Sequence, residues 1–248
     1  MAALQLLPFN RRNVLMKYVL YGVLRAAEDV EQRLRALTEG EPVCLIASGG
    51  LAAAVSMAPA GPPDPKRHAE IVQILHELCT VLPMRCGIGV QTEAEVQALL
   101  RDRAGQFRAA LAALQGCAEM GLRVLCSVTA ACGAEAETGE PLSRIGTYLA
   151  SRKTYYASRD ARRRELLHVA DRIQRSFDGL FLKCKMTPLS WGDTPILSFQ
   201  FLVRRSDTDR FRDAFRRLQQ QAIEKLLLTG PWPPYSFATL DSASLLRV

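Results

Sequence analysis

The chain has 248 residues, enough for one large domain or two small ones, and its 48% hydrophobic and 23% charged residues are ordinary for a globular protein. No apolar run approaches the roughly 18 residues of a membrane span, and the first residues lack the pattern of a signal peptide, so we expect a cytoplasmic protein. The net charge of +7 permits an acidic partner, but the arginines are scattered. Their one dense cluster (Arg159, Arg162, Arg163, Arg164) is interpreted as a solvated helix face, with nucleic-acid contact as the less favoured alternative.

The first part of the chain predicts a small sheet covered by two helices. Strands are predicted at 18–23, 43–47, 51–57 and 83–90, and helices at 26–39 and 66–79. The middle two strands flank Ser48-Gly49-Gly50, which is typical of a hairpin turn. The order strand, helix, strand, strand, helix, strand predicts a ferredoxin-like domain over residues 14–91, with a four-stranded antiparallel sheet.

A long helix over 92–118 is predicted next, because Thr92 can cap its first turn and Glu95 completes a capping box. We expect residues 92–119 to connect two domains. The order of elements then repeats over 120–248, with strands at 121–128, 180–186 and 195–204, helices at 142–177 and 207–228, a surface loop at 130–141 and a final extended segment. The predicted fold class is α+β, with two ferredoxin-like βαββαβ-type units joined by a helical connector.

The final extended segment, 230–237, reads Gly-Pro-Trp-Pro-Pro-Tyr-Ser-Phe. Its three prolines exclude a helix, and Gly230 is expected to stop the helix before it. The prolines would hold Trp232, Tyr235 and Phe237 in fixed directions. Rigid aromatic side chains of this kind either plug the core of their own domain or anchor a partner at a small entropic cost. The residues alone favour the plug and leave the anchor open.

The residues give no sign of an active site, a metal site or a cofactor. None of the seven cysteines forms a Cys-x-x-Cys pair, which argues against a disulfide framework or a zinc site and suits a reducing cytoplasm. His68 and His76 would lie roughly 12 Å apart along one helix, too far for one metal ion, and His168 stands alone. We therefore expect no catalytic residue, no metal and no cofactor.

Arg85 is the one charged residue in the apolar run Leu82-Pro83-Met84-Arg85-Cys86-Gly87. It could pair with a buried carboxylate or anchor a ligand, and the structural pair is favoured. RNA binding by a ferredoxin-like sheet needs exposed aromatic side chains on the central strands. The predicted strands carry aliphatic residues such as Leu20 and Leu45 there, so nucleic-acid binding is not expected.

The segment at 230–237 resembles the C-terminal signature of the gas vesicle protein GvpF/GvpL family. Weaker matches follow in the right order: Tyr21-Gly22, the strand ending in Val55-Ser56, Leu82-Pro83-Met84-Arg85 before Gly87, Glu119-Met120-Gly121-Leu122-Arg123-Val124, and Gly146-Thr147-Tyr148-Leu149. Together they span about Tyr18 to Phe237. Cys86 departs from the family pattern, which usually has Phe there.

The resemblance implies a non-enzymatic accessory or minor structural protein for gas vesicle assembly, located in the cytoplasm and at the gas vesicle. Its expected partners are the small hydrophobic shell protein GvpA and other gas vesicle accessory proteins, without nucleic acid or lipid membrane. The expected contact residues are Trp232, Tyr235, Phe237 and Arg85, with the partner met by strand addition or in an apolar groove between the units.

Two other functions remain open. The first is a regulatory module that senses a small anion or metabolite with paired ferredoxin-like domains, which the basic charge would suit. The second is a hydrolase that uses Cys86 or Cys44, which would need a base within reach.

Overall fold

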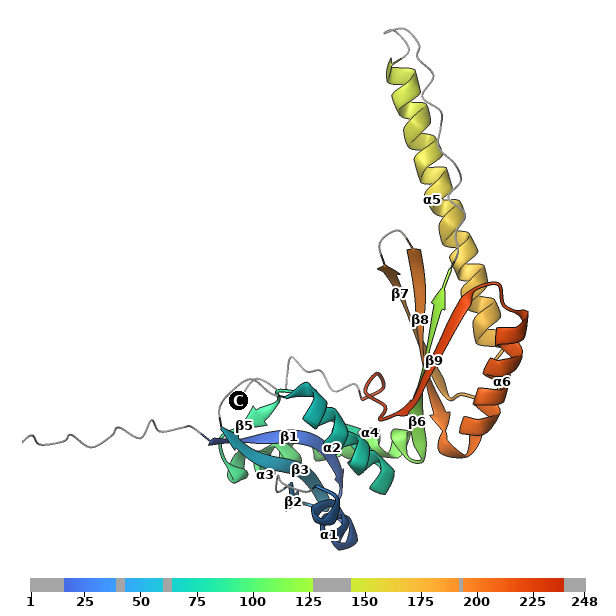
Figure 1. The fold of residues 1–248 in the computed structure, drawn as a ribbon. Coiled ribbons are helices and arrows are strands. Elements are labelled where there is room, and N and C mark those ends of the chain that lie inside the picture. The colour runs from blue at the N-terminus through green and yellow to red at the C-terminus, as the bar shows by residue number, and fades with distance from the viewer. Residues whose placement is uncertain (1–15, 39–42, 60–63, 127–143, 192–193, 239–248) are drawn as a thin grey trace, which may run out of the picture. The chain divides into compact units, whose positions relative to one another are not determined.

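The computed structural model describes residues 16–38, 43–59, 64–126, 144–191 and 194–238 (Figure 1). The chain forms two compact units, one made of Met1–Gln115 with Pro233–Val248 and the other of Gly116–Trp232. The chain therefore passes from the first unit to the second at Gly116 and back to the first at Pro233. This division differs from the predicted one, which placed 120–248 in a single C-terminal domain.

The first unit is built on an antiparallel sheet in the order β2-β3-β1-β4, with β5 also paired to β1. Its elements are β1 (Met16–Arg25), α1 (Glu28–Leu37), β2 (Cys44–Ser48), β3 (Leu51–Pro59), α2 (Pro65–Leu78), β4 (Val81–Pro83), β5 (Gly89–Val90), α3 (Glu93–Asp102) and α4 (Ala104–Leu114). The predicted hairpin between β2 and β3 is confirmed, and Gly49 and Gly50 supply the positive φ angles of its turn.

The sheet of the first unit is covered on both faces. Ala52 and Ala54 of β3 pack in one cluster with residues of α1 and α2. Leu51, Ala53 and Val55, which alternate with them, are also at most 1% exposed. Because side chains alternate between the faces of a strand, a second layer must cover the opposite face. That layer is α3 and α4, which contact β2 and β3, and β4 and β1, respectively.

The predicted connecting helix over 92–118 is thus wrong as a single helix. Thr92 does cap it, since its hydroxyl oxygen accepts from the Glu95 N–H at 3.2 Å. The helix breaks at Arg103, and the chain continues as α4 to Leu114. Packing explains why the segment is not a free connector. Both helices are held on the first unit because each buries two apolar side chains, Val96 and Leu100 in α3 and Phe107 and Leu111 in α4.

The second unit has an antiparallel sheet in the order β7-β8-β6-β9. Its elements are β6 (Cys117–Leu125), α5 (Arg144–Arg175), β7 (Lys183–Trp191), β8 (Thr194–Arg204), the 3-10 turn Arg205–Asp207, α6 (Thr208–Gln221) and β9 (Lys225–Trp232). In both units, the first strand lies between the third and the fourth, and the second strand lies beyond the third. The two units therefore share one connectivity.

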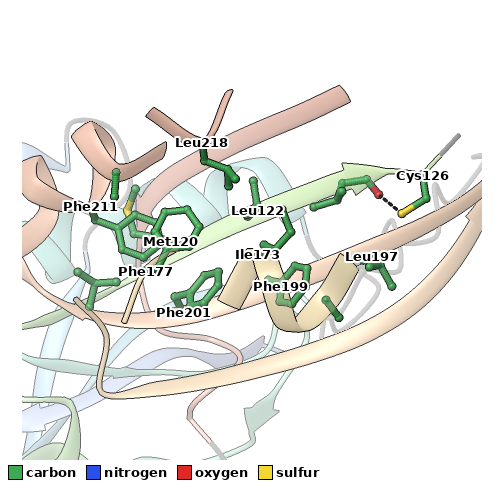
Figure 2. Packing of buried hydrophobic residues seen from close by; sticks show 14 residues of the cluster. Met120, Leu122, Cys126, Ile173, Phe177, Leu197, Phe199, Phe201, Phe211 and Leu218 are labelled. Atoms are coloured by element: carbon green, nitrogen blue, oxygen red, sulfur yellow. Dashed lines mark hydrogen bonds between the residues drawn. The ribbon is translucent and has the colours of Figure 1, made fainter. Parts of the chain in front are cut away.

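The core of the second unit is aromatic (Figure 2). The Phe201 ring of β8 lies 5.2 to 5.8 Å, centroid to centroid, from four other rings, those of Phe177, Phe181, Phe199 and Phe211. Phe177 follows α5 and stacks on Phe211 of α6 with a centroid separation of 4.3 Å. These contacts fasten both helices to one face of the sheet.

The predicted helix over 207–228 is wrong beyond Gln221. Leu226 and Leu228 pack against the core while Leu227 is 52% exposed, so burial alternates with the period of a strand. A run of three leucines is compatible with the period of a helix and with that of a strand. Pairing with β6 stabilises the strand. Gly230 consequently lies within β9, and it does not stop a helix.

Candidate partner-binding site

Arg85 lies in an exposed turn between β4 and β5. The Ile88 N–H donates to the Arg85 carbonyl oxygen at 3.3 Å, and Gly87 has a φ of +93°. A strand cannot run through this conformation, so the predicted continuous strand over 83–90 is wrong. Among the residues that the structure describes, the Arg85 guanidinium has no hydrogen bond or ion pair, so the favoured structural pair is not found.

A buried polar network holds the residue before this turn. The Met84 N–H donates to the Tyr21 carbonyl oxygen at 2.9 Å, and the Met84 carbonyl oxygen lies 2.9 Å from Nε2 of His68. The Tyr21 hydroxyl and Ser56 Oγ are 2.8 Å apart, and the Tyr21 and His68 rings are 5.2 Å apart. Strands β1 and β3 and helix α2 thus position the turn that carries Arg85.

This arrangement favours the neutral form of His68. Since the Met84 carbonyl oxygen can only accept, Nε2 carries a proton, and in the neutral ring Nδ1 is an unprotonated acceptor. Nδ1 is buried without a hydrogen-bond partner among the described residues. Burial lowers the pKa of His68 below its ordinary value of 6.5, and the hydrogen bond to Met84 opposes this only in part.

We expect stability to fall as pH drops below 6.5. Because the folded pKa of His68 is lower than the unfolded one, the unfolded state binds more protons between these values. The His68 contribution is therefore complete above pH 6.5 and is lost as pH falls towards the folded pKa, with a slope of at most about 1.4 kcal/mol per pH unit. Chemical denaturation between pH 7.5 and 5 measures it.

His68→Gln should flatten this pH dependence, because the glutamine amide can still donate to the Met84 carbonyl oxygen. The matched control is His168→Gln, since His168 is exposed on α5. The control should keep the wild-type slope. An equal slope for wild type and His68→Gln would contradict the assignment of the effect to His68.

The C-terminal segment is fixed through its prolines. Pro233 and Pro234 are buried in the first unit. The chain then turns, and the N–H groups of Phe237 and Ala238 donate to the Pro234 carbonyl oxygen at 3.1 and 3.0 Å. The two prolines are buried, whereas the aromatic side chains that were expected to plug a core are exposed to different degrees.

Tyr235 is 39% exposed, and its phenol lies close to the turn that carries Arg85. Burial of the phenol, together with the nearby Cys86 thiolate charge, raises the pKa of Tyr235 to about 12. The structure thus brings Tyr235 near the Arg85–Cys86 turn. Phe237 is half-buried in the same unit, and Trp232 is 50% exposed at the end of β9 in the other unit.

Three findings bear on metal sites, membrane spans and ligand pockets. Within the described ranges, no three His, Cys, Asp or Glu side chains gather as metal ligands, and no helix is long and apolar enough to cross a bilayer. A pocket of about 200 Å³ in the first unit is lined by Arg25, Ala27, Val30, Cys79, Thr80, Leu111 and Gln115. It is smaller than the roughly 300–1,000 Å³ typical of small-molecule sites.

The described chain consists of two α+β units, each with an antiparallel sheet. Arg85 is exposed in a turn of the first unit, and the half-exposed Trp232 and Tyr235 flank two buried prolines. The family model described as "Gas vesicle synthesis protein GvpL/GvpF" matches residues 17–239. The chain belongs to this family, and the resemblance predicted from its C-terminal segment is confirmed.

Curated relatives agree with this membership. The chain is 23% identical over 235 residues to gas vesicle protein F of Haloferax mediterranei, covering 89% of this chain and 92% of the relative. It is 25% identical over 228 residues to gas vesicle protein L of a Streptomyces species, covering 80% of this chain and 84% of the relative.

Solved structures show the same fold. The crystal structure of GvpF from an Anabaena species matches with a TM-score of 0.67 at 17% identity, covering 91% of this chain and 97% of that one. GvpF from Microcystis aeruginosa matches with a TM-score of 0.61 at 18% identity, covering 90% and 99%. The α+β class with antiparallel sheets is therefore confirmed.

Proposed function

We propose that this chain is a non-enzymatic accessory or minor structural protein of gas vesicle assembly that binds the small hydrophobic shell protein GvpA and other accessory proteins. The observation that carries the proposal is the family match, which extends over residues 17–239 of 248. The relatives named as gas vesicle proteins F and L are covered over most of their lengths. Action in the cytoplasm and at the gas vesicle follows from the same role.

The proposed contact combines the Arg85 turn with the C-terminal segment. Tyr235 and Trp232 display 39% and 50% of their surfaces, although the two prolines between them are buried. Such anchors lose little conformational freedom when a partner covers them, which favours binding to an apolar shell subunit. Arg85 is exposed in the turn whose Cys86 interacts electrostatically with the Tyr235 phenol, and it can pair with a carboxylate of the partner.

Strand addition to the sheet of the second unit is the less favoured mode of binding. The edge strand β7 contains Pro188 and exposes Lys183 and Lys185, and the edge strand β9 contains Pro231. Proline and lysine on an edge oppose pairing with another chain. We therefore place the shell-protein contact on displayed side chains.

We also infer that each unit is a ferredoxin-like domain. The shared strand order, with helices after the first and third strands, supports this. The first domain carries β5, α3 and α4 in addition. The proposed boundaries fall at Gln115/Gly116 and Trp232/Pro233, in place of 14–91, 92–119 and 120–248.

Capture of shell protein tests the contact. The tagged chain is co-expressed with a GvpA-type shell protein, and the soluble shell protein that co-purifies is measured. The double variant Trp232→Ala/Tyr235→Ala should capture roughly tenfold less or worse, since two half-exposed aromatic anchors are removed. Arg85→Ala should give a smaller loss, because an exposed charge pair is weaker.

The control variant is Leu37→Ala/Leu167→Ala, which removes two apolar side chains that are 54% and 52% exposed elsewhere. It should capture as much shell protein as wild type. Circular dichroism and melting curves establish that each variant is folded. A folded Trp232→Ala/Tyr235→Ala variant with undiminished capture would exclude the C-terminal segment as the contact.

A further inference from the structure

Helix α5 carries almost all of the net charge of the chain. Its 32 residues include nine Lys or Arg and three Asp or Glu, a net charge of +6, compared with +7 for the whole protein. Outside α5 the chain is therefore nearly neutral. A charge asymmetry of this size indicates an interaction segment rather than general solubility.

Among the α5 side chains that the structure describes, only those of the C-terminal part pack on the sheet. Ala170 and Ile173 are buried, and Leu166 packs against the same core. By contrast, Arg152, Tyr156 and every residue from 159 to 165 are exposed. Figure 1 shows α5 extending past the end of the sheet of its own unit. Helices in water depend on the packing of one face, and this stretch has no such packing among the described residues.

The exposed stretch lies on the same face of α5 that is buried nearer the C-terminus of the helix. Counting back from Ile173 in alternating steps of three and four residues gives Ala170, Leu166, Arg163, Arg159, Tyr156 and Arg152. This spacing places all of them on one side of a helix. The stripe is apolar where it meets the sheet and basic beyond it. We call residues 152, 156, 159 and 163 the basic stripe.

The side chains of the basic stripe differ in how far the described residues pair with them. A guanidinium nitrogen of Arg152 donates to the Tyr156 hydroxyl at 3.3 Å. Arg159 and Arg163 are one turn apart, so their charges repel each other. Neither of these two arginines has an ion pair with any described residue. A partner that supplies carboxylates would convert this repulsion into attraction.

We propose that the basic stripe of α5 docks an acidic amphipathic helix of a protein partner. The alternating three- and four-residue spacing matches the spacing of side chains on a second helix, and its length of about 16 Å corresponds to three turns. Nucleic acid is the less favoured occupant because Asp160, three residues before Arg163, places a carboxylate beside the stripe that would repel phosphate groups. A second copy of α5 is excluded as occupant because both helices would be strongly positive.

A designed peptide tests the proposal on the full chain. The probe is an alanine-based helical peptide with four glutamates at alternating three- and four-residue spacing, labelled for fluorescence anisotropy. An isomer of the same composition has the glutamates dispersed around the helix. We expect the patterned peptide to bind several-fold more tightly than the isomer at low salt, because only it can meet the whole stripe.

Matched variants separate the stripe from net charge. Arg159→Gln/Arg163→Gln should weaken binding of the patterned peptide roughly fivefold or more. The control Arg164→Gln/Arg175→Gln removes two exposed charges from other sides of α5 and should change binding less than twofold. Circular dichroism should show the same helix content for both variants.

The inference is overturned if the patterned peptide does not bind, if both peptides bind alike, or if both variants weaken binding alike. Tighter binding of a DNA duplex than of the patterned peptide, lost in Arg159→Gln/Arg163→Gln, would identify a nucleic-acid surface and also overturn it. The shell-protein contact is tested separately, because Arg85 and Tyr235 belong to the other unit.

Discussion

Phe201→Ala is expected to cost about 3–5 kcal/mol of the stability of the second unit. Phe201 is fully buried, and its ring contacts four other rings (Figure 2). Truncation removes these contacts and leaves a cavity that Phe177 and Phe211, fixed by α5 and α6, cannot fill. Denaturant unfolding followed by tryptophan fluorescence measures the effect, since Trp191 and Trp232 both lie in this unit.

Two further variants provide reference values for the loss of stability expected in Phe201→Ala. Phe201→Leu keeps most of the volume and should cost much less than the alanine substitution, about 1–2 kcal/mol. Leu189→Ala removes a side chain that is 48% exposed in β7 and should be close to neutral. A loss below about 1 kcal/mol for Phe201→Ala would contradict the view that the aromatic cluster holds α5 and α6 on the sheet.

Gly230→Ala is expected to cost about 2–5 kcal/mol, for two reasons. Gly230 has a φ of +107°, which side chains rarely tolerate. In addition, a Cβ there would lie 2.7 Å from the Glu119 carbonyl oxygen of β6, and backbone cannot move aside as a flexible side chain can. Thermal and denaturant unfolding should both show the loss.

Gly116→Ala separates the two causes. Gly116 also has a positive φ, +65°, but nothing lies within 4 Å of the position of its Cβ. It should therefore cost only the conformational part, about 1–2 kcal/mol. Equal losses for Gly116→Ala and Gly230→Ala would contradict a steric role for the close approach between β9 and β6.

These glycines show why the sequence predicted the family more reliably than the fold. The C-terminal signature begins at Gly230, where the backbone has a positive φ and a Cβ would lie only 2.7 Å from the Glu119 carbonyl oxygen of β6. A short motif can thus be highly specific even when its conformation is misread. Local features whose sequence pattern fits only one conformation, such as the Gly49-Gly50 hairpin and the Thr92 cap, were also predicted correctly.

Predictions failed where tertiary contacts choose between local alternatives. Leu226, Leu227 and Leu228 fit a helix or a strand, and pairing with β6 selects the strand. The break at Arg103 and the packing of α3 and α4 on the first unit likewise depend on a sheet face that the sequence pattern does not reveal.

The candidate site could be predicted only as separate parts. Arg85 and Tyr235 are 150 positions apart, and nothing in the sequence places them in the same unit. The turn at Gly87 that exposes Arg85 could have been suspected from the glycine, but the apolar residues before it favoured a strand. In the sequence, Arg159 and Arg163 were interpreted only as part of a solvated helix face, and the basic stripe can be recognised only once the buried part of the same face is known.

Gas vesicle formation tests the central claim most directly. A set of gas vesicle genes from which the GvpF/GvpL-type genes have been removed is expressed in a host without vesicles, with and without the gene for this chain, and vesicles are measured by pressure-sensitive light scattering. The proposed role predicts that vesicles form when the chain is present and are lost or strongly reduced when it is omitted. Equal vesicle yields in the two strains would contradict a role in assembly.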